Sequence, residues 1–192
     1  MNFYSDDIIN NLIDYGPLET MIDDISDFKA QTKYMCITYS AVSIGPGYTE
    51  AVISDDRTKY VFYCLDPVFC VANCPSIMAY RRVFDKATNT VTYYMLFLCT
   101  KRRFKGQGYA GHLLSGFVDY IRAKEFGDAE NVEKQGRNVN IILSSVETAV
   151  TFYEERGFKW NRKTLTDYPI LMRYEALIEG KEYFMMELDV KP

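Results

Sequence analysis

The sequence lacks the features that are typical of repeat proteins, membrane proteins and secreted proteins. Its 192 residues include one histidine and one tryptophan, and they contain no internal repeat. No apolar run approaches the roughly eighteen residues that a membrane-spanning helix needs. The first residues carry Asp6 and Asp7 and lack the basic start of a secretory signal. We therefore expect a cytoplasmic protein with no membrane partner.

Cysteine chemistry is also scarce. The chain has five cysteines, and most of them stand in apolar runs. An odd number in apolar surroundings is typical of buried thiols in a reducing compartment rather than of a disulfide framework. No metal site is expected. The cysteines are Cys36, Cys64, Cys70, Cys74 and Cys99.

Length and charge narrow the remaining classes. A chain of 192 residues can build one substantial core and is short for two, so we expect a single domain over residues 1–192. The formal net charge is −4. The basic cluster around Arg102 is local, the whole chain is acidic, and no nucleic-acid motif accompanies the cluster, so a nucleic-acid partner is not expected.

The most informative segment is a glycine-rich turn near the middle of the chain. An apolar strand pattern runs to Thr100, cations follow between Lys101 and Lys105, and a helical pattern begins after Gly108. Glycines at 106 and 108 let backbone N–H groups approach an anion, and the N-terminus of a helix adds positive potential at the same place. The turn therefore predicts a phosphate-binding site.

Two common phosphate-binding motifs do not fit this turn. Gly106, Gly108 and Gly111 match G-x-G-x-x-G, but a dinucleotide fingerprint follows its strand directly and meets an acidic residue about 20 positions later. Here a polar stretch precedes the glycines, and the next expected strand, 139–143, lies much further on and ends in Ser144. A P-loop would need Lys-Ser or Lys-Thr after the last glycine, and neither is present.

The turn resembles motif A of the GNAT superfamily of acyl-CoA-dependent N-acyltransferases. That motif is Gln or Arg, two residues, Gly, one residue, then Gly or Ala, and here it reads Arg103-x-x-Gly106-x-Gly108. Residues 149–158 resemble motif B, a helix that carries Ala and Phe-Tyr or Leu-Tyr and ends in Gly-Phe. Residues 184–189 resemble the closing strand. Many members carry Asn at the start of the motif B helix, where this chain has Val146.

The resemblance implies a GNAT fold, a mixed α/β domain whose central, mainly antiparallel sheet is flanked by helices. Residue patterns indicate the same class. We expect helices within 1–32 with Ser5 as an N-cap, strands at 34–42 and 60–65, and a turn at Gly45-Pro46-Gly47.

The later part of the chain is patterned more clearly. Apolar runs at 77–84 and 91–99 predict an antiparallel hairpin. Ser144 and Glu147 predict a capping box that begins the motif B helix, and Gly157 ends that helix. The other expected elements are a helix from Gly108 to about Gly127 and strands at 139–143, 158–160 and 183–189.

The resemblance also implies an activity, the transfer of an acetyl group from acetyl-CoA to a primary amine by direct attack. Backbone groups at 96–98 would pair with the pantetheine arm, and the N–H of Leu98 would hold the oxyanion. Tyr153 would protonate the departing thiolate. The residues matched to cofactor binding are Leu96, Phe97, Leu98, Arg103, Phe104, Lys105, Gly106, Gln107, Gly108 and Tyr109.

The general base is less clear. Tyr94 lies where some members of the family place a proton relay, but it is a weak candidate because an unperturbed tyrosine titrates near 10. His112 follows Gly111 inside the expected helix, which favours a surface or packing role. Cys99 lies in an apolar strand, where a thiol is usually inert.

The acceptor is an amine of a class that the sequence leaves open, either a small molecule such as a polyamine or a lysine side chain. The expected helices within 1–32 would contribute to its site, and their acidic residues either attract a cation or form a solvated helix face, which we favour. A homodimer also stays open. The alternative to an enzyme is a catalytically degenerate module that binds CoA and regulates a partner.

Overall fold

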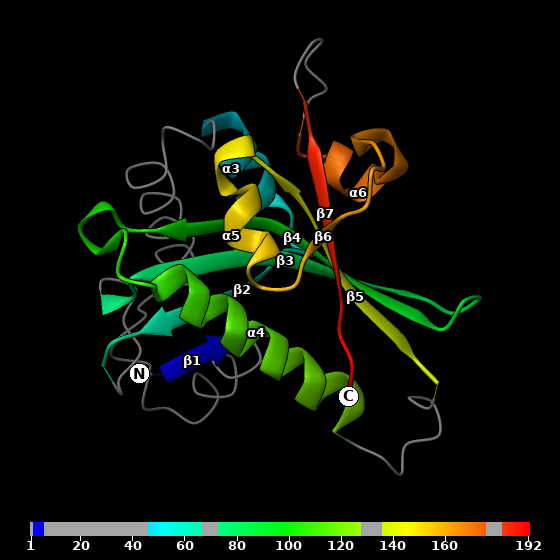
Figure 1. Ribbon diagram of the computed structural model, residues 1–192, viewed down its shortest axis with the longest axis horizontal. Helices are drawn as coiled ribbons and strands as arrows, with labels where there is room; N and C mark the ends of the chain where they lie inside the picture. Colours follow the sequence, from blue (N-terminus) through cyan, green and yellow to red (C-terminus); the bar gives the residue numbers. More distant parts are fainter. Residues whose placement is uncertain (1, 6–45, 67–72, 128–135, 176–181) are drawn as a thin grey trace. The chain divides into compact units, whose positions relative to one another are not determined.

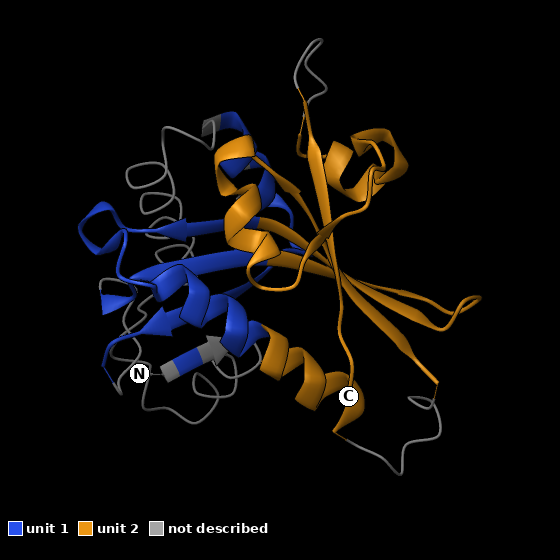
Figure 2. Cartoon of the chain, in the orientation of Figure 1, with its two compact units in different colours: residues 1–79, 97–117 blue, residues 80–96, 118–192 orange. Residues whose placement is uncertain are grey.

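The computed structural model describes residues 2–5, 46–66, 73–127, 136–175 and 182–192 (Figure 1). The chain forms two compact units (Figure 2). The first unit contains the described residues of 1–79 and 97–117, and the second contains those of 80–96 and 118–192. The predicted helices within 6–32 and the predicted strand at 34–42 lie outside the described residues.

The first unit holds one edge of a sheet and a helix. Strand β1 (Asn2–Ser5) pairs antiparallel with β2 (Lys59–Cys64), and the strand order continues through β3 (Ser76–Asp85) to β4 (Thr90–Thr100). The last five residues of β2 are all buried, as expected for an aromatic and β-branched strand covered on both faces. Phe3 packs so closely on the helix α4 (Tyr109–Phe126) that a Cβ at Gly116 would lie 2.9 Å from its ring.

The second unit contains residues 80–85 of β3, residues 90–96 of β4, and the strands β5, β7 and β6, which follow β4 in that order. The strands β5 (Asn138–Ser145) and β4 are parallel, whereas β7 (Phe184–Asp189) pairs antiparallel with β5 and with β6 (Lys159–Trp160). With antiparallel β1 and β2, these pairings confirm the predicted mixed α/β class and its mainly antiparallel sheet. None of the helices among the described residues is long and apolar enough to cross a membrane.

Several predicted elements are confirmed. β3 and β4 are neighbours joined by the turn at 86–89, which is the predicted hairpin. The helix α4 follows Gly108 and ends next to Gly127. The predicted strands at 60–65, 139–143, 158–160 and 183–189 correspond to β2, β5, β6 and β7.

Two predictions near the N-terminus are wrong. Ser5 belongs to strand β1 rather than to the N-cap of a helix, because residues 2–5 pair with the distant strand β2. Pro46 and Gly47, two residues of the predicted turn at Gly45-Pro46-Gly47, instead begin the helix α3 (Pro46–Ser54), and Gly45 lies outside the described residues. A proline in the first turn of a helix lacks only an N–H that would have no helical partner, so Pro46 suits this position.

The predicted capping box at Ser144 and Glu147 is also wrong. Ser144 and Ser145 continue β5 and pair with Met185 and Phe184 of β7. The next turn, η4 (Glu147–Ala149), begins at Val146 and has no side-chain cap, and the helix α5 (Val150–Glu154) follows. A capping box occurs instead in η5 (Leu165–Asp167), between its N-cap Thr164 and Asp167, and the helix α6 (Pro169–Met172) follows; neither short helix was predicted.

A buried carboxylate fastens the end of α4 to three strands of the second unit. Glu125 is 1% exposed and accepts hydrogen bonds from Arg82 of β3 at 2.7 and 3.0 Å. Arg137, just before β5, and Tyr93 of β4 donate to it at 2.7 and 2.5 Å. Burial alone would raise the pKa of Glu125, but the bonds from Arg82 and the other donors outweigh it and lower the pKa to about 2.

We predict that Glu125→Gln lowers the free energy of unfolding by about 3–5 kcal/mol, because it leaves the guanidinium of Arg137, 8% exposed, without its counter-charge. Urea titration measures this. The matched control Asp119→Asn removes an exposed i,i+3 pair with Arg122 and should cost less than about 0.5 kcal/mol.

The same carboxylate predicts a pH dependence. Its folded pKa is lowered, so its contribution to stability is complete above the ordinary value of 4.5 and is lost as the pH falls towards 2. The unfolding free energy of the native protein should therefore fall over this range more steeply than that of Glu125→Gln. Parallel curves for the two proteins would contradict the role of Glu125.

Candidate functional site

The glycine turn lies entirely in the first unit, between the end of β4 and the start of α4. Gly106 and Gly108 have φ angles of 76° and 82°, in the left-handed region that favours glycine. A Cβ at Gly106 would meet nothing within 4 Å, and one at Gly108 would meet only the ring of His112, at 3.8 Å. The turn therefore requires glycine for its backbone conformation, and its outer surface is open.

The N–H groups of the turn divide into two sets. Those of Phe104 and Lys105 donate to the carbonyls of Lys101 and Arg102 within the short helix η2 (Arg102–Phe104). Those of Gly106, Gln107 and Gly108 meet no backbone acceptor among the described residues. The first N–H groups of α4, beginning at Tyr109, have no partner within their helix. The donors available to an anion are thus narrower than the predicted span from Phe104 to Tyr109.

Side chains support the turn from within the first unit. The guanidinium of Arg103 lies 4.6 Å from the centre of the Phe104 ring, and that ring meets Tyr109 edge-on at 5.5 Å. Gln107 donates to the carbonyl of Arg103 at 2.9 Å. Arg102 and Lys105 are exposed. The exposed cations and available N–H groups fit a di-anionic phosphate group.

A second feature lies in the second unit, where the parallel strands β4 and β5 stop pairing. Their register runs from Thr90 and Asn138 to Met95 and Leu143. β4 then continues to Thr100, and β5 continues to Ser145 with β7 as its partner. Leu96, one of the residues matched to the pantetheine arm, is the first residue of β4 beyond this pairing.

The segment that resembles motif B also lies in the second unit. Tyr153 of α5 is 8% exposed, and its ring packs edge-on against Phe152 and Phe158 at centroid distances of 5.0 and 5.5 Å. Gly157 ends the segment with φ 84°, as predicted. Its N–H and that of Phe158 donate to Glu154 and Tyr153 at 2.9 and 3.1 Å, which is the Schellman arrangement.

Comparisons with known proteins bear on the fold. No protein-family description matches the chain, and no curated protein does. Solved structures do match: a protein from Desulfovibrio desulfuricans described within the GNAT family has TM-score 0.57 and 13% identity, covering 99% of each chain. The chain has the GNAT acetyltransferase fold.

Two further solved structures match. The catalytic domain of the Tetrahymena GCN5 histone acetyltransferase, in complex with coenzyme A, has TM-score 0.53 and 12% identity, covering 100% of this chain and 92% of its own. The Escherichia coli ribosomal-protein-S18-alanine N-acetyltransferase has TM-score 0.52 and 15% identity, covering 88% of this chain and 91% of its own. The GNAT architecture is thus retained at very low identity.

The strand β4 and the helix α4 contain the other residues that the sequence predicted for the site. Leu96 and Phe97 are buried in β4, and Leu98 is half-buried. Tyr94 is half-buried, and burial, with Tyr168 and Glu187 nearby, raises its pKa. His112 is exposed and stacks on Tyr63 at 5.8 Å, as expected of a packing residue.

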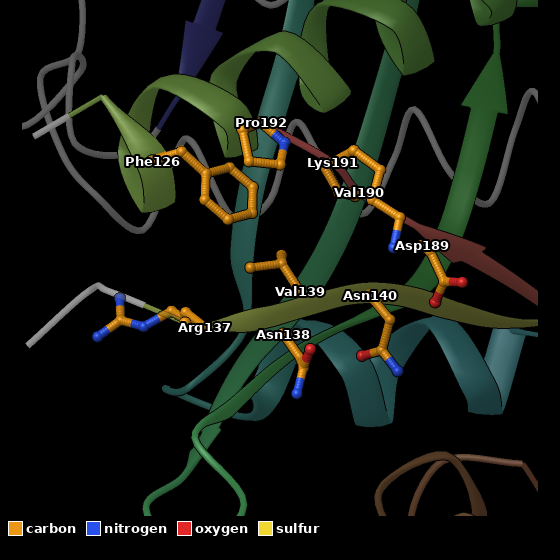
Figure 3. A pocket seen from close by; sticks show the side chains of 10 residues that line it. Phe126, Arg137, Asn138, Val139, Asn140, Asp189, Val190, Lys191 and Pro192 are labelled. Carbon is orange, nitrogen blue, oxygen red and sulfur yellow. The ribbon is translucent and has the colours of Figure 1, made fainter. Parts of the chain in front are cut away.

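A buried thiol and a cavity are further features of the described residues. Cys99 is buried, and no cluster of metal-ligating residues occurs among the described residues. A cavity of about 510 Å³ lies in the second unit, where β5 begins and β7 has ended, so it is at the opposite end of β5 from the divergence at Leu143 (Figure 3). It is lined by Phe126, Gly136, Arg137, Asn138, Val139, Asn140, Asp189, Val190, Lys191 and Pro192.

The sequence did not reveal a polar cluster on one face of the second unit. Glu187 of β7 accepts hydrogen bonds from Asn140 and Asn161, and Asn161 also donates to Tyr168. One signal was available, since Glu187 places a carboxylate between apolar residues of the closing strand, after Met186 and before Leu188. Its two partners come from separate segments and could not be identified without the fold.

We predict that Gly157→Ala destabilises the protein by about 1–2 kcal/mol, the cost of placing an L-residue in the left-handed region. Steric clash adds little, because the new Cβ would lie 3.5 Å from Leu188, an ordinary contact. Urea unfolding measures the loss. Gly47→Ala, at a helical position with nothing within 4 Å of the added Cβ, is the control and should not destabilise; equal losses would contradict the prediction.

Proposed function

We propose that this protein is an N-acetyltransferase that moves the acetyl group of acetyl-CoA to a primary amine by direct attack. The acceptor is a small amine such as a polyamine, or a lysine side chain. The observation that carries the proposal is the glycine turn, where two left-handed glycines, available N–H groups and exposed cations come together. A CoA-bound structure among the matches has the same fold, which supports the assignment of this turn to the pyrophosphate.

The proposed cofactor-binding residues lie in β4 and in the glycine turn that follows it. The N–H groups of Gly106 to Tyr109 bind the pyrophosphate, and Arg103 and Lys105 add positive charge beside it. Phe104 supports the turn through its ring contact with Tyr109. Beyond the last paired residues Met95 and Leu143, the backbone of 96–98 in β4 holds the pantetheine arm.

Two residues take part in the chemistry. The N–H of Leu98 donates to the acetyl oxygen, where negative charge develops during attack. The hydroxyl of Tyr153 gives a proton to the departing CoA sulfur, which avoids release of a thiolate. Burial and two edge-on ring contacts fix the orientation of Tyr153, and a fixed orientation is what a proton donor needs.

Direct attack requires an amine that has lost its proton. Tyr94 is the only tyrosine proposed as a base, and its raised pKa keeps the phenol protonated at neutral pH. Direct loss of the amine proton to solvent is therefore compatible with the site. Two observations favour the second candidate, a CoA-binding regulatory module. The proposed base Tyr94 is protonated at neutral pH, and the apolar Val146 is 41% exposed at the start of η4.

Titration of the protein with acetyl-CoA tests the cofactor site. We expect micromolar binding that is lost in Gly108→Glu, because the new carboxylate repels the pyrophosphate and its backbone resists φ 82°. Gly47→Glu adds the same charge to an open position on α3 and should bind as the native protein does. No binding by the folded native protein would reject both the enzyme and the CoA-binding module.

Turnover separates these two candidates. Tyr153→Phe should lower kcat by about a hundredfold or more while leaving the Kd for acetyl-CoA within about twofold, because only the proton is removed. Tyr183→Phe, at a half-buried tyrosine just before β7, is the matched control. Unchanged kcat in Tyr153→Phe would reject the proton-donor role, and absence of turnover in the native protein across an amine panel would favour the regulatory module.

A further inference from the structure

Glu187 lies at the centre of a polar cluster within the second unit. Its Oε1 accepts from the side-chain amide of Asn140 at 2.9 Å, and its Oε2 accepts from that of Asn161 at 3.0 Å. The Asn161 amide also donates to the hydroxyl of Tyr168 at 2.6 Å, and the Tyr168 ring meets Tyr94 edge-on at 6.4 Å. β5, β7 and the segment after β6 therefore bring these groups together.

The cluster holds more acceptors than donors. The two amides that bind Glu187 are neutral, and no ion pair within 4.0 Å joins Glu187 to another of the described residues. The amide oxygen of Asn140 is buried and has no hydrogen-bond partner in the described part of the chain. Because its nitrogen faces the carboxylate, the orientation of this amide is fixed by charge. A carboxylate whose hydrogen-bond donors are neutral suits an N–H-rich cation.

Two native cations lie in the same unit. Lys159 of β6 is the Cα partner of Glu187, and its side chain is exposed. Arg81 of β3 is buried and donates to the hydroxyl of Tyr174 at 3.1 Å. Neither meets the carboxylate at ion-pair distance. Glu187 is half-buried, which leaves part of its side chain exposed to an external ammonium group.

The position of Glu187 relates it to the strands proposed to bind acetyl-CoA. Tyr94, Ile142 and Glu187 are Cα partners across β4, β5 and β7, so they form one row on one face of the sheet. This row directly precedes the last paired residues, Met95 and Leu143. Two strand spacings, about 10 Å, separate β4 from β7.

We propose that Glu187 binds the second, non-reacting ammonium of an aliphatic di- or polyamine acceptor. This inference rests on the proposed function. A carboxylate favours the charged form of a neighbouring amine, whereas the attacking nitrogen has to be neutral. Glu187 is therefore suited to the far end of the acceptor, with the reacting nitrogen about 10 Å away, near β4.

The test compares two ligands that differ in one ammonium group, 1,8-diaminooctane and 8-amino-1-octanol. Calorimetric titration of the native protein, in the presence of CoA, should give about tenfold tighter binding of the diamine, as expected for one charge-assisted hydrogen-bonded contact. The preference should shrink as salt is raised. Equal binding of the two ligands by the native protein would overturn the proposal.

Substitutions at Glu187 test whether its carboxylate causes the preference for the diamine. Glu187→Gln should reduce it to about twofold or less, Glu187→Asp should keep most of it because the charge remains, and Glu182→Gln, an exposed carboxylate before β7, should leave it unchanged. Urea unfolding verifies that each variant is folded. A full preference in folded Glu187→Gln, or equal losses in Glu187→Gln and Glu187→Asp, would contradict recognition by the carboxylate.

Acetyl-CoA is titrated in parallel to separate this inference from the proposed function. Diamine preference without acetyl-CoA binding would reject the acetyltransferase and leave Glu187 as a cation site. Acetyl-CoA binding without diamine preference would reject the Glu187 site and leave the acetyltransferase.

Discussion

The parallel pairing of β4 with β5 is the constraint on which the candidate site depends. Two parallel strands cannot be joined by a tight turn, so the chain has to cross from the end of one to the start of the other, usually through a helix. Here α4 lies in that crossover. Its N-terminus consequently follows the end of β4, with only the glycine turn between them, and this places the available N–H groups next to the strand proposed to bind the pantetheine arm.

The other end of the crossover is held by Glu125. A carboxylate at 1% exposure would be strongly destabilising alone, and two guanidinium groups and a phenol compensate it. Their strands, β3 and β4, and Arg137 just before β5 are the neighbours that the end of α4 has to reach. Hydrophobic contacts could bury the same helix in several rotations, whereas three hydrogen-bonding partners accept only one. We infer that this network fixes the rotation of the helix as well as its position.

Local signals explain which elements the sequence predicted correctly. The hairpin of β3 and β4 depends on two adjacent apolar runs and a polar turn, and the turn after α5 is signalled in the sequence by Gly157. Non-local pairing explains the failures. Ser144 and Ser145 look like the start of a helix, but the ladder with Met185 and Phe184 on β7 takes their backbone into β5. Ser5 was misassigned for the same reason, since the partner of β1 is β2, more than fifty residues away.

In the candidate site, too, local features could be predicted from the sequence and non-local features could not. The glycine turn is contiguous in sequence, and its conformation follows from residues within a few positions of one another, so it could be predicted with its glycine requirement. Its donor set could not be predicted fully, because η2 uses the N–H groups of Phe104 and Lys105 internally. The Glu187 cluster joins three segments and becomes visible only when β5 and β7 are paired.

Val146 stands where many GNAT members carry Asn, and it leaves the start of η4 without a side-chain cap. A residue with no polar side-chain atom at the start of η4 cannot cap the first N–H groups, and such a cap typically contributes about 1 kcal/mol. The segment is secured instead at its other end, where the Schellman bonds close on Tyr153 and Glu154 and the Tyr153 ring packs between Phe152 and Phe158. The position of Tyr153 thus depends on the C-terminal end of α5. A change at the N-terminal end can therefore occur without displacing the proposed proton donor.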